Sequence, residues 1–210
     1  MLTGKAYVVT GATGALGRGI VDALLDAGAS VGIVGGRAPG VARLLGELQA
    51  GGRAVGEPAD LTDEAQTIAA VAAVAERLGG IDGLVAAAGG FGGGKPVHET
   101  PLADWSGQQE TNLTTAFLTC KAVAPHLIQR GGGAIVTIGS RPALRGAPYI
   151  AAYSVAKGGV VRLTEALAAE LLDKEITVNC LLPSTIDTPA NRAGADEADI
   201  AKWVTPGEIA

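Results

Sequence analysis

Short apolar runs alternate with longer segments of helical periodicity along the whole chain, and this alternation limits the folds that the chain can adopt. The runs are apolar almost throughout, which is typical of strands buried on both faces of a parallel sheet. Strands that are each followed by a helix indicate a doubly wound α/β domain. The expected strands are residues 5–10, 30–34, 53–57, 81–88, 133–139 and 176–182. The expected helices are residues 15–27, 38–50, 62–78, 101–130 and 151–173, with Thr62 as the N-cap of the third.

The length and composition of the chain indicate one domain that covers residues 1–210. A chain of this length can bury a large core, and neither an internal repeat nor a linker interrupts it. Because hydrophobic residues make up 48% of the chain and aromatic ones only 3%, the core must consist of Ala, Val, Leu and Ile. A net charge of −5 without any basic block argues against nucleic acid and anionic membranes as partners.

Three sequence features indicate the cellular compartment of the protein and whether it binds a metal: its hydropathy, its cysteines and its histidines. No apolar run approaches the ~20 residues of a membrane span, and the first residues do not resemble a signal peptide. Cys120 and Cys180 lie far apart in apolar elements, where buried thiols are expected rather than a disulfide. We therefore expect a cytoplasmic protein. His98 and His126 have no ligand partner at metal-binding spacing, so no metal site is predicted.

A glycine-rich turn, VVTGATGALGRG, follows the first expected strand and opens the first expected helix. Gly11, Gly14 and Gly17 allow a sharp turn and a close approach of backbone N–H groups to a ligand. The start of the helix offers free donors and a partial positive charge, which suit a pyrophosphate. A purely structural turn is the alternative, but its position after the first strand favours a dinucleotide site.

The end of the second expected strand predicts which dinucleotide is preferred. Gly36 stands where an acidic residue would bind the adenosine ribose, and Arg37 follows it. The planar guanidinium of Arg37 suits a 2′-phosphate, although a solvated loop arginine is the alternative and Arg18 could share the role. We therefore expect a preference for NADP(H), with NAD(H) as a second cofactor.

Tyr153 and Lys157 lie four residues apart in the last expected helix, so both side chains leave the same face. A tyrosine hydroxyl is a poor acid–base catalyst at neutral pH unless a nearby positive charge stabilises its ionised form. The Lys157 ammonium could supply that charge. Taken alone, the pair is equally compatible with an ordinary helix surface, so other motifs must decide.

Together these motifs resemble those of the short-chain dehydrogenase/reductase family over essentially the whole chain. The family's glycine motif, TGxxxGxG, is similar to TGATGALG at residues 10–17, with Ala15 in place of one glycine. Its NAG and PG motifs resemble AAG at residues 87–89 and PS at residues 183–184. YxxxK is matched by Tyr153 and Lys157. Ser140 matches the family's catalytic serine, and Asn112 matches its helix asparagine. Asp60 matches its adenine-contacting aspartate.

The resemblance implies a Rossmann fold and hydride transfer between a nicotinamide dinucleotide and a small carbonyl or alcohol. Tyr153 would be the general acid or base, Ser140 would bind the substrate oxygen, and Asn112 would hold a water that connects Lys157 to solvent. The implied catalytic residues are Asn112, Ser140, Tyr153 and Lys157. The implied cofactor-binding residues are Gly11, Thr13, Leu16, Gly17, Arg37, Asp60, Leu61, Ala87, Ala88, Gly89, Tyr153, Lys157, Pro183, Ile186 and Thr188.

Further expectations concern the loops, the assembly and the alternatives. Residues 89–95 are expected to form a mobile binding loop and residues 189–203 to cover the active site. Because the chain ends at WVTPGEIA, the last strand of the family is expected to be absent. The long apolar helices predict a homodimer, with a homotetramer as the alternative. A non-catalytic dinucleotide sensor or scaffold is the second functional hypothesis, and an epimerase or dehydratase is the third.

Overall fold

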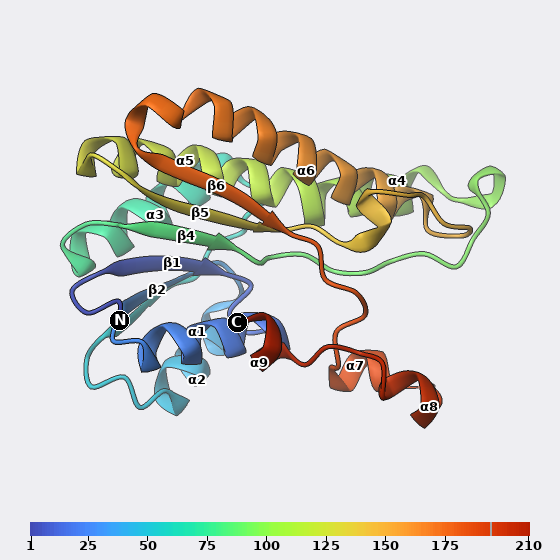
Figure 1. Ribbon diagram of the computed structural model, residues 1–210, viewed down its shortest axis with the longest axis horizontal. Helices are drawn as coiled ribbons and strands as arrows, with labels where there is room; N and C mark the ends of the chain where they lie inside the picture. The colour runs from blue at the N-terminus through green and yellow to red at the C-terminus, as the bar shows by residue number, and fades with distance from the viewer. Residues whose placement is uncertain (194) are drawn as a thin grey trace.

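The computed structural model describes residues 1–193 and 195–210, and its centre is one parallel sheet of six strands (Figure 1). The strands are β1 (Ala6–Thr10), β2 (Ser30–Val34), β3 (Ala54–Glu57), β4 (Gly83–Ala86), β5 (Gly133–Ile138) and β6 (Ile176–Leu181). Their order in the sheet is β3–β2–β1–β4–β5–β6, which confirms the predicted doubly wound α/β fold. The order reverses between β1 and β4, and ligands bind at such a switch point.

Helices cover both faces of this sheet. α1 and α2 pack on one face, and α3, α5 and α6 pack on the other (Figure 1). Successive residues of β4 point to opposite faces, so that Leu84 joins the core under α3 and α5 while Val85 packs against the core under α1 and α2. The helices are α1 (Ala15–Asp26), α2 (Ala38–Glu47), α3 (Glu64–Leu78), α4 (Leu102–Gln109), α5 (Thr115–Arg130), α6 (Ala151–Glu170), α7 (Pro189–Arg192), α8 (Glu197–Ile200) and α9 (Pro206–Ile209).

The helix predicted over residues 101–130 is observed from Leu102 to Arg130, but it is not α-helical throughout. α4 ends at Gln109, a π-helical turn (Glu110–Thr114) follows, and α5 begins at Thr115. The wide turn carries Asn112, whose side chain leaves the helix surface to bind the loop after β4. Such π-helical turns are frequent at functional sites. The apolar pattern continues through this turn, which is why the sequence predicted one helix.

The predicted N-cap of α3 was wrong by one residue. Asp63, and not Thr62, caps the helix by accepting a hydrogen bond from the Gln66 N–H at 2.9 Å. Thr62 instead donates its hydroxyl to Asp60 at 2.7 Å. Both residues are good caps by type, and the competing bond to Asp60 decides between them.

The two cysteines differ in burial. Cys120 is buried in α5 as predicted, whereas Cys180 is only half-buried, because β6 is the outer strand in the described part of the sheet. Both are free thiols. Across residues 1–193 and 195–210, no helix has the length and apolar character needed to cross a membrane. The same residues contain no group of three or more His, Cys, Asp or Glu side chains that could hold a metal ion.

Candidate active site

Lys157 is a buried cation at the carboxyl end of the sheet. Its side chain is only 5% exposed, and its Nζ donates a hydrogen bond to the Ile138 carbonyl oxygen at 2.8 Å. Because Ile138 is the last residue of β5, this bond ties α6 to the end of that strand. Tyr153 lies one turn earlier on α6, with its ring centroid 6.0 Å from the same Nζ. The two residues therefore share one face of the helix, as their spacing indicates.

Burial changes the acidity of this lysine. Loss of hydration lowers the pKa of Lys157 from 10.5 to about 8, and the nearby Cys180 acts in the opposite direction. The hydrogen-bond partner of the ammonium in the described residues is a neutral carbonyl, which does not compensate the buried charge as a carboxylate would. A lysine with this pKa can release and recover a proton close to neutral pH.

Asn112 is almost fully buried and binds the loop after β4 through both ends of its amide. Its Oδ1 accepts from the Gly90 N–H at 3.1 Å, and its Nδ2 donates to the Gly90 carbonyl at 3.0 Å. A Cβ on Gly89 would lie 2.7 Å from Asn112 Oδ1 and 3.2 Å from Lys157 Nζ. These two polar groups therefore face the same point of the loop, and only glycine fits between them.

Ser140 lies two residues after the end of β5 and is 8% exposed. Its backbone is extended, and it leads into a short 3₁₀ turn (Arg141–Ala143) that packs against α6. The hydroxyl is thus attached two residues beyond Ile138, the residue that binds Lys157. Ser140, Tyr153, Lys157 and Asn112 come from three separate elements, and the carboxyl ends of β4 and β5 bring these elements together.

The turn between β1 and α1 forms a cradle of backbone atoms. Gly11 has φ +68°, and a Cβ on it would lie 2.6 Å from the Ala87 carbonyl oxygen. A Cβ on Gly17 would lie 2.1 Å from the Gly11 carbonyl oxygen. α1 begins after Gly14 without a side-chain cap, which leaves its first N–H groups to bind an anion. The cradle therefore offers the free backbone donors that a dinucleotide pyrophosphate requires.

The residues after β4 run alongside this cradle. The Ala88 N–H donates to Thr10 Oγ1 at 3.1 Å, and Ala87 contacts the turn at Gly11. Thr10 is the last residue of β1, so the bond joins the ends of the two strands that flank the switch point. Ala87, Ala88 and Gly89 thus connect the cradle to Asn112 and Lys157.

Gly36 and Arg37 follow β2 at the same edge of the sheet as the cradle, because β1 and β2 are parallel neighbours. Gly36 has φ +84°, and a Cβ there would lie 3.9 Å from Thr13 Oγ1. With glycine at this position, no side chain of residue 36 occupies the space beside Thr13. Arg37 is exposed and forms the N-cap position of α2. The helix start and the guanidinium together favour an anionic group at this place.

Arg18, the other candidate for that role, is already paired. Its guanidinium binds Asp22 at 2.9 Å and Glu47 at 2.9 Å. The hydrogen bond to Asp22 and its charge raise the pKa of Arg18. Two carboxylates beside Arg18 would repel a phosphate, so Arg37 is the better candidate.

Asp60 and Leu61 follow β3 at the same edge of the sheet. Asp60 Oδ1 accepts from the Thr62 hydroxyl at 2.7 Å and from its N–H at 2.9 Å, and these bonds lower the pKa of the carboxyl. Leu61 is buried, and a Cβ on Gly35 would lie 2.7 Å from its Cδ1. The Asp60 carboxylate is therefore ionised and bound to Thr62, and the neighbouring Leu61 packs against Gly35 just after β2.

The segment after β6 crosses toward α1 (Figure 1). The Pro183 carbonyl accepts from the Arg141 N–H at 3.2 Å, and Ile186 pairs with Val204 in an isolated bridge. The Thr188 hydroxyl caps α7 by accepting a backbone N–H at 3.2 Å. The predicted cover, residues 189–203, contains α7 and α8 in its described part, and residue 194 lies outside the described residues.

Two side chains beside this site were not singled out in the sequence. The Phe91 ring lies edge-on to the Tyr153 ring, with centroids 5.2 Å apart and an interplanar angle of 72°. Gln108 Oε1 accepts from Asn112 Nδ2 at 3.3 Å. The available signals were a single aromatic residue in a glycine-rich loop and a glutamine one helical turn before the asparagine.

A glycine-rich turn at the switch point, with a tyrosine and a buried lysine at the neighbouring strand ends, is the arrangement expected of a dinucleotide-dependent oxidoreductase. The family model described as short chain dehydrogenase matches residues 5–199, and the chain belongs to that family. This confirms the resemblance noted in the sequence. Members of the family bind a nicotinamide dinucleotide.

Named relatives and solved structures agree with this assignment. D-threitol dehydrogenase of Mycolicibacterium smegmatis (strain ATCC 700084 / mc(2)155) is 36% identical over 98% of this chain and 80% of its own. D-beta-hydroxybutyrate dehydrogenase of Rhizobium meliloti (strain 1021) is 34% identical over 88% of this chain and 72% of its own. The crystal structure of 3-ketoacyl-(acyl-carrier-protein) reductase from Brucella melitensis complexed with NADH matches with a TM-score of 0.90 and 28% identity, and covers 100% of this chain and 88% of that one. The predicted oxidoreductase function is therefore confirmed.

Proposed function

We propose that this oxidoreductase transfers hydride between NADP(H) and a small carbonyl or alcohol, with Tyr153 as the general acid or base. The observation that supports this proposal most directly is that the side chains of Tyr153, Lys157 and Asn112 lie close together at the carboxyl ends of the strands, beside the glycine cradle. When bound, the nicotinamide supplies or accepts the hydride. Reduction of a panel of carbonyl compounds, followed by the loss of nicotinamide absorbance, tests this function; an inert protein that still binds NADPH would contradict it.

Each site residue has one task in this mechanism. Ser140 donates a hydrogen bond to the substrate oxygen and stabilises the charge that develops on it. Tyr153 gives its proton to that oxygen during reduction and takes it back during oxidation. Lys157 stabilises the ionised tyrosine, and its lowered pKa lets it pass a proton onward. Asn112 fixes Gly90 and presents Oδ1 to the region of Lys157, where a water can complete the path to solvent.

We expect kcat/KM to favour NADPH over NADH, and Arg37→Ala to remove most of that preference. A charge-assisted hydrogen bond to the 2′-phosphate contributes roughly 1.5–3 kcal/mol, or about ten- to a hundredfold in kcat/KM. The measurement compares kcat/KM for both cofactors in the unmodified protein and in the variant. Arg43→Ala is the matched control, because Arg43 is also exposed on α2 and pairs with Glu47. Equal or better activity with NADH in the unmodified protein would refute the role of Arg37.

We propose a homodimer in which α5 and α6 pair with their counterparts across a two-fold axis. Large apolar side chains remain exposed on these helices, including Phe117 at 46% and Val155 at 50%. In Figure 1 both helices lie along one outer side of the molecule. An apolar surface of this kind is typical of an interface between subunits. A homotetramer would need a second interface.

We expect a dimeric mass by light scattering at micromolar concentration, and a monomeric mass for the double variant Phe117→Glu and Val155→Glu. Two buried carboxylates without partners are too costly for the interface to persist. Ile68→Glu is the control, because Ile68 is 45% exposed on α3, outside the proposed interface. A monomeric unmodified protein, or a dimer in the double variant, would contradict the pairing of these helices.

We also propose a cytoplasmic location. Cys120 and Cys180 are both free thiols, and Cys120 is buried with its pKa raised to about 12 by burial. Free thiols are typical of proteins in reducing compartments. The negative net charge and the small-molecule site give no reason to expect nucleic acid or a membrane as partner.

A further inference from the structure

Phe91 is an exposed aromatic side chain beside the proposed acid. Its residue is 68% exposed, although its ring already meets the Tyr153 ring edge-on at 5.2 Å. The free face of the phenyl ring is therefore available to a ligand that reaches Tyr153. An aromatic face in this position favours an apolar group and offers no hydrogen bond to a polar one.

The backbone on both sides of Phe91 is held by one helical segment, which we call the Asn112–Gln108 clamp. Asn112 binds the N–H and the carbonyl of Gly90. On the other side, a Cβ on Gly92 would lie only 2.4 Å from Gln108 Nε2, so this glycine packs closely against the glutamine amide. Gln108 Oε1 in turn accepts from Asn112 Nδ2 at 3.3 Å.

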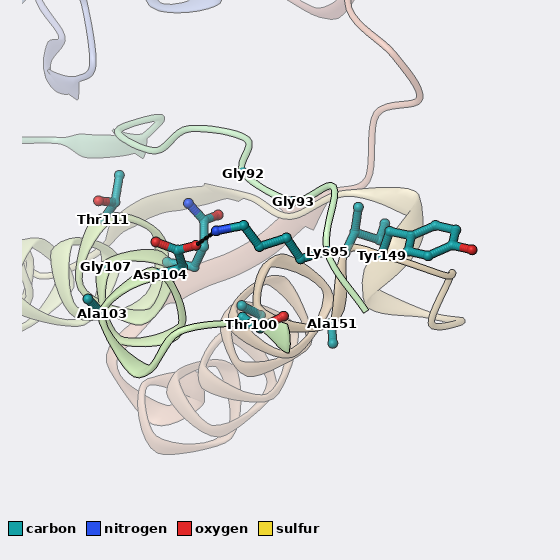
Figure 2. A pocket seen from close by; sticks show the side chains of 13 residues that line it. Gly92, Gly93, Lys95, Thr100, Ala103, Asp104, Gly107, Thr111, Tyr149 and Ala151 are labelled. Atoms are coloured by element: carbon teal, nitrogen blue, oxygen red, sulfur yellow. Dashed lines mark hydrogen bonds and ion pairs between the residues drawn. The ribbon is translucent and has the colours of Figure 1, made fainter. Parts of the chain in front are cut away.

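The loop that carries Phe91 borders a cavity, and the clamp keeps the loop from moving into that cavity. A cavity of about 460 Å³ lies between the loop, α4 and residues 149–152, and Gly92 and Gln108 line it (Figure 2). Neither Phe91 nor Tyr153 lines this cavity. A glycine-rich loop with room behind it has little intrinsic stiffness. Without the glutamine amide, the loop could move into the cavity and carry Phe91 away from Tyr153.

We propose that Phe91 is a specificity-determining residue that binds an apolar substituent on the substrate carbonyl, and that Gln108 is a positioning residue that holds Phe91 there. The inference rests on the proposed reduction of carbonyls and adds the substrate class: ketones, or the corresponding secondary alcohols, with an apolar alkyl or aryl arm. One methylene more or less in a hydrophobic pocket changes kcat/KM by roughly 10–200-fold, so loss of the larger phenyl contact should change it by about tenfold or more.

Two methyl ketones test the role of Phe91: 4-phenyl-2-butanone carries an apolar arm, and hydroxyacetone carries a small polar one. The unmodified protein with NADPH should prefer the phenyl ketone in kcat/KM. Phe91→Ala should lower kcat/KM for the phenyl ketone by about tenfold or more, and that for hydroxyacetone by less than about threefold. Equal losses for both ketones, or a preference of the unmodified protein for hydroxyacetone, would overturn the inference.

Gln108→Leu should raise KM for the phenyl ketone while leaving KM for hydroxyacetone nearly unchanged. Gln108→Glu keeps an acceptor for Asn112 Nδ2 and should restore most of the lost affinity. A merely structural role for Gln108 would affect both ketones alike and would not be rescued by glutamate. That result would overturn its positioning role.

A direct measurement of ketone binding distinguishes a failure of this inference from a failure of the proposed function. Saturation-transfer NMR with NADPH present reports whether 4-phenyl-2-butanone binds, independently of turnover. Reduction of hydroxyacetone without binding or reduction of the phenyl ketone would overturn the role of Phe91 and leave the proposed function intact. Binding of the phenyl ketone that is lost in Phe91→Ala, in a protein that reduces neither ketone, would support Phe91 and count against the proposed reduction.

Discussion

Tyr153→Phe should lower kcat by on the order of 10²-fold or more, because general acid–base catalysis typically contributes 10²–10⁴-fold. The variant loses only the hydroxyl and keeps the ring that packs against Phe91. Binding of NADPH, followed by the change in its fluorescence, should therefore stay within about threefold of the unmodified protein. Loss of turnover with retained cofactor binding is the result expected of an enzyme and not of a sensor.

The chain offers a matched control in Tyr149→Phe. Tyr149 lies four residues earlier and is 60% exposed, and Figure 2 shows its ring pointing away from the cavity. Removing its hydroxyl should leave kcat nearly unchanged. If the Tyr153 variant kept its turnover while correctly folded, another group would be the acid, and the mechanism proposed above would be wrong.

The sheet could be predicted because each strand carries its own local signal. Each predicted strand overlaps an observed one, since apolar runs between glycines and charged residues mark strand ends directly. The errors arose where a tertiary contact decides the outcome. Asn112 lies in the π-helical turn and its amide binds Gly90, while Thr62 binds Asp60 and leaves the cap of α3 to Asp63. Neither contact leaves a trace in local periodicity.

The same distinction applies to the active site. The spacing of Tyr153 and Lys157 predicted that they share one helix face, and the resemblance to the family's YxxxK motif then marked them as catalytic candidates. Phe91 meets Tyr153 only through the packing of a glycine-rich loop, and no periodic pattern describes such a loop. The burial of Lys157 at the end of β5 likewise follows from the packing of α6 on the sheet. The sequence therefore indicated the candidate residues of the site, but not the Phe91 contact with Tyr153 or the burial of Lys157.

Lys157→Met should lower kcat by on the order of 10²-fold or more and at the same time stabilise the fold at neutral pH. The cofactor-free protein keeps an ammonium in a site that lowers its pKa from 10.5 to about 8. That pKa shift means that the buried ammonium destabilises the folded protein by about 3 kcal/mol at pH 7. The methionine variant avoids this cost, but it also loses the hydrogen bond to the Ile138 carbonyl, which stabilises the fold by about 1 kcal/mol. We expect the variant to be about 2 kcal/mol more stable at pH 7.

The sign of the pH dependence follows from linkage. The pKa of Lys157 is lower in the folded than in the unfolded protein, so between about pH 8 and pH 10.5 the unfolded state binds more protons. The stability of the unmodified protein therefore rises as the pH increases over this range, and it is lost again as the pH falls back to about 8. Methionine does not titrate. The advantage of the variant should therefore be full at pH 7 and shrink steadily above pH 8, until it disappears or reverses.

Urea unfolding of the cofactor-free proteins between pH 7 and pH 10 measures this difference directly. Lys121→Met is the control, because Lys121 is an exposed cation on α5 that pairs with Glu64, and such surface pairs contribute about 0–1 kcal/mol. A Lys157 variant that is less stable at pH 7, with a difference that does not change up to pH 10, would show that the buried ammonium costs nothing. In that case the lowered pKa could not be the source of the proton transfer assigned to Lys157, because the same burial must produce both effects.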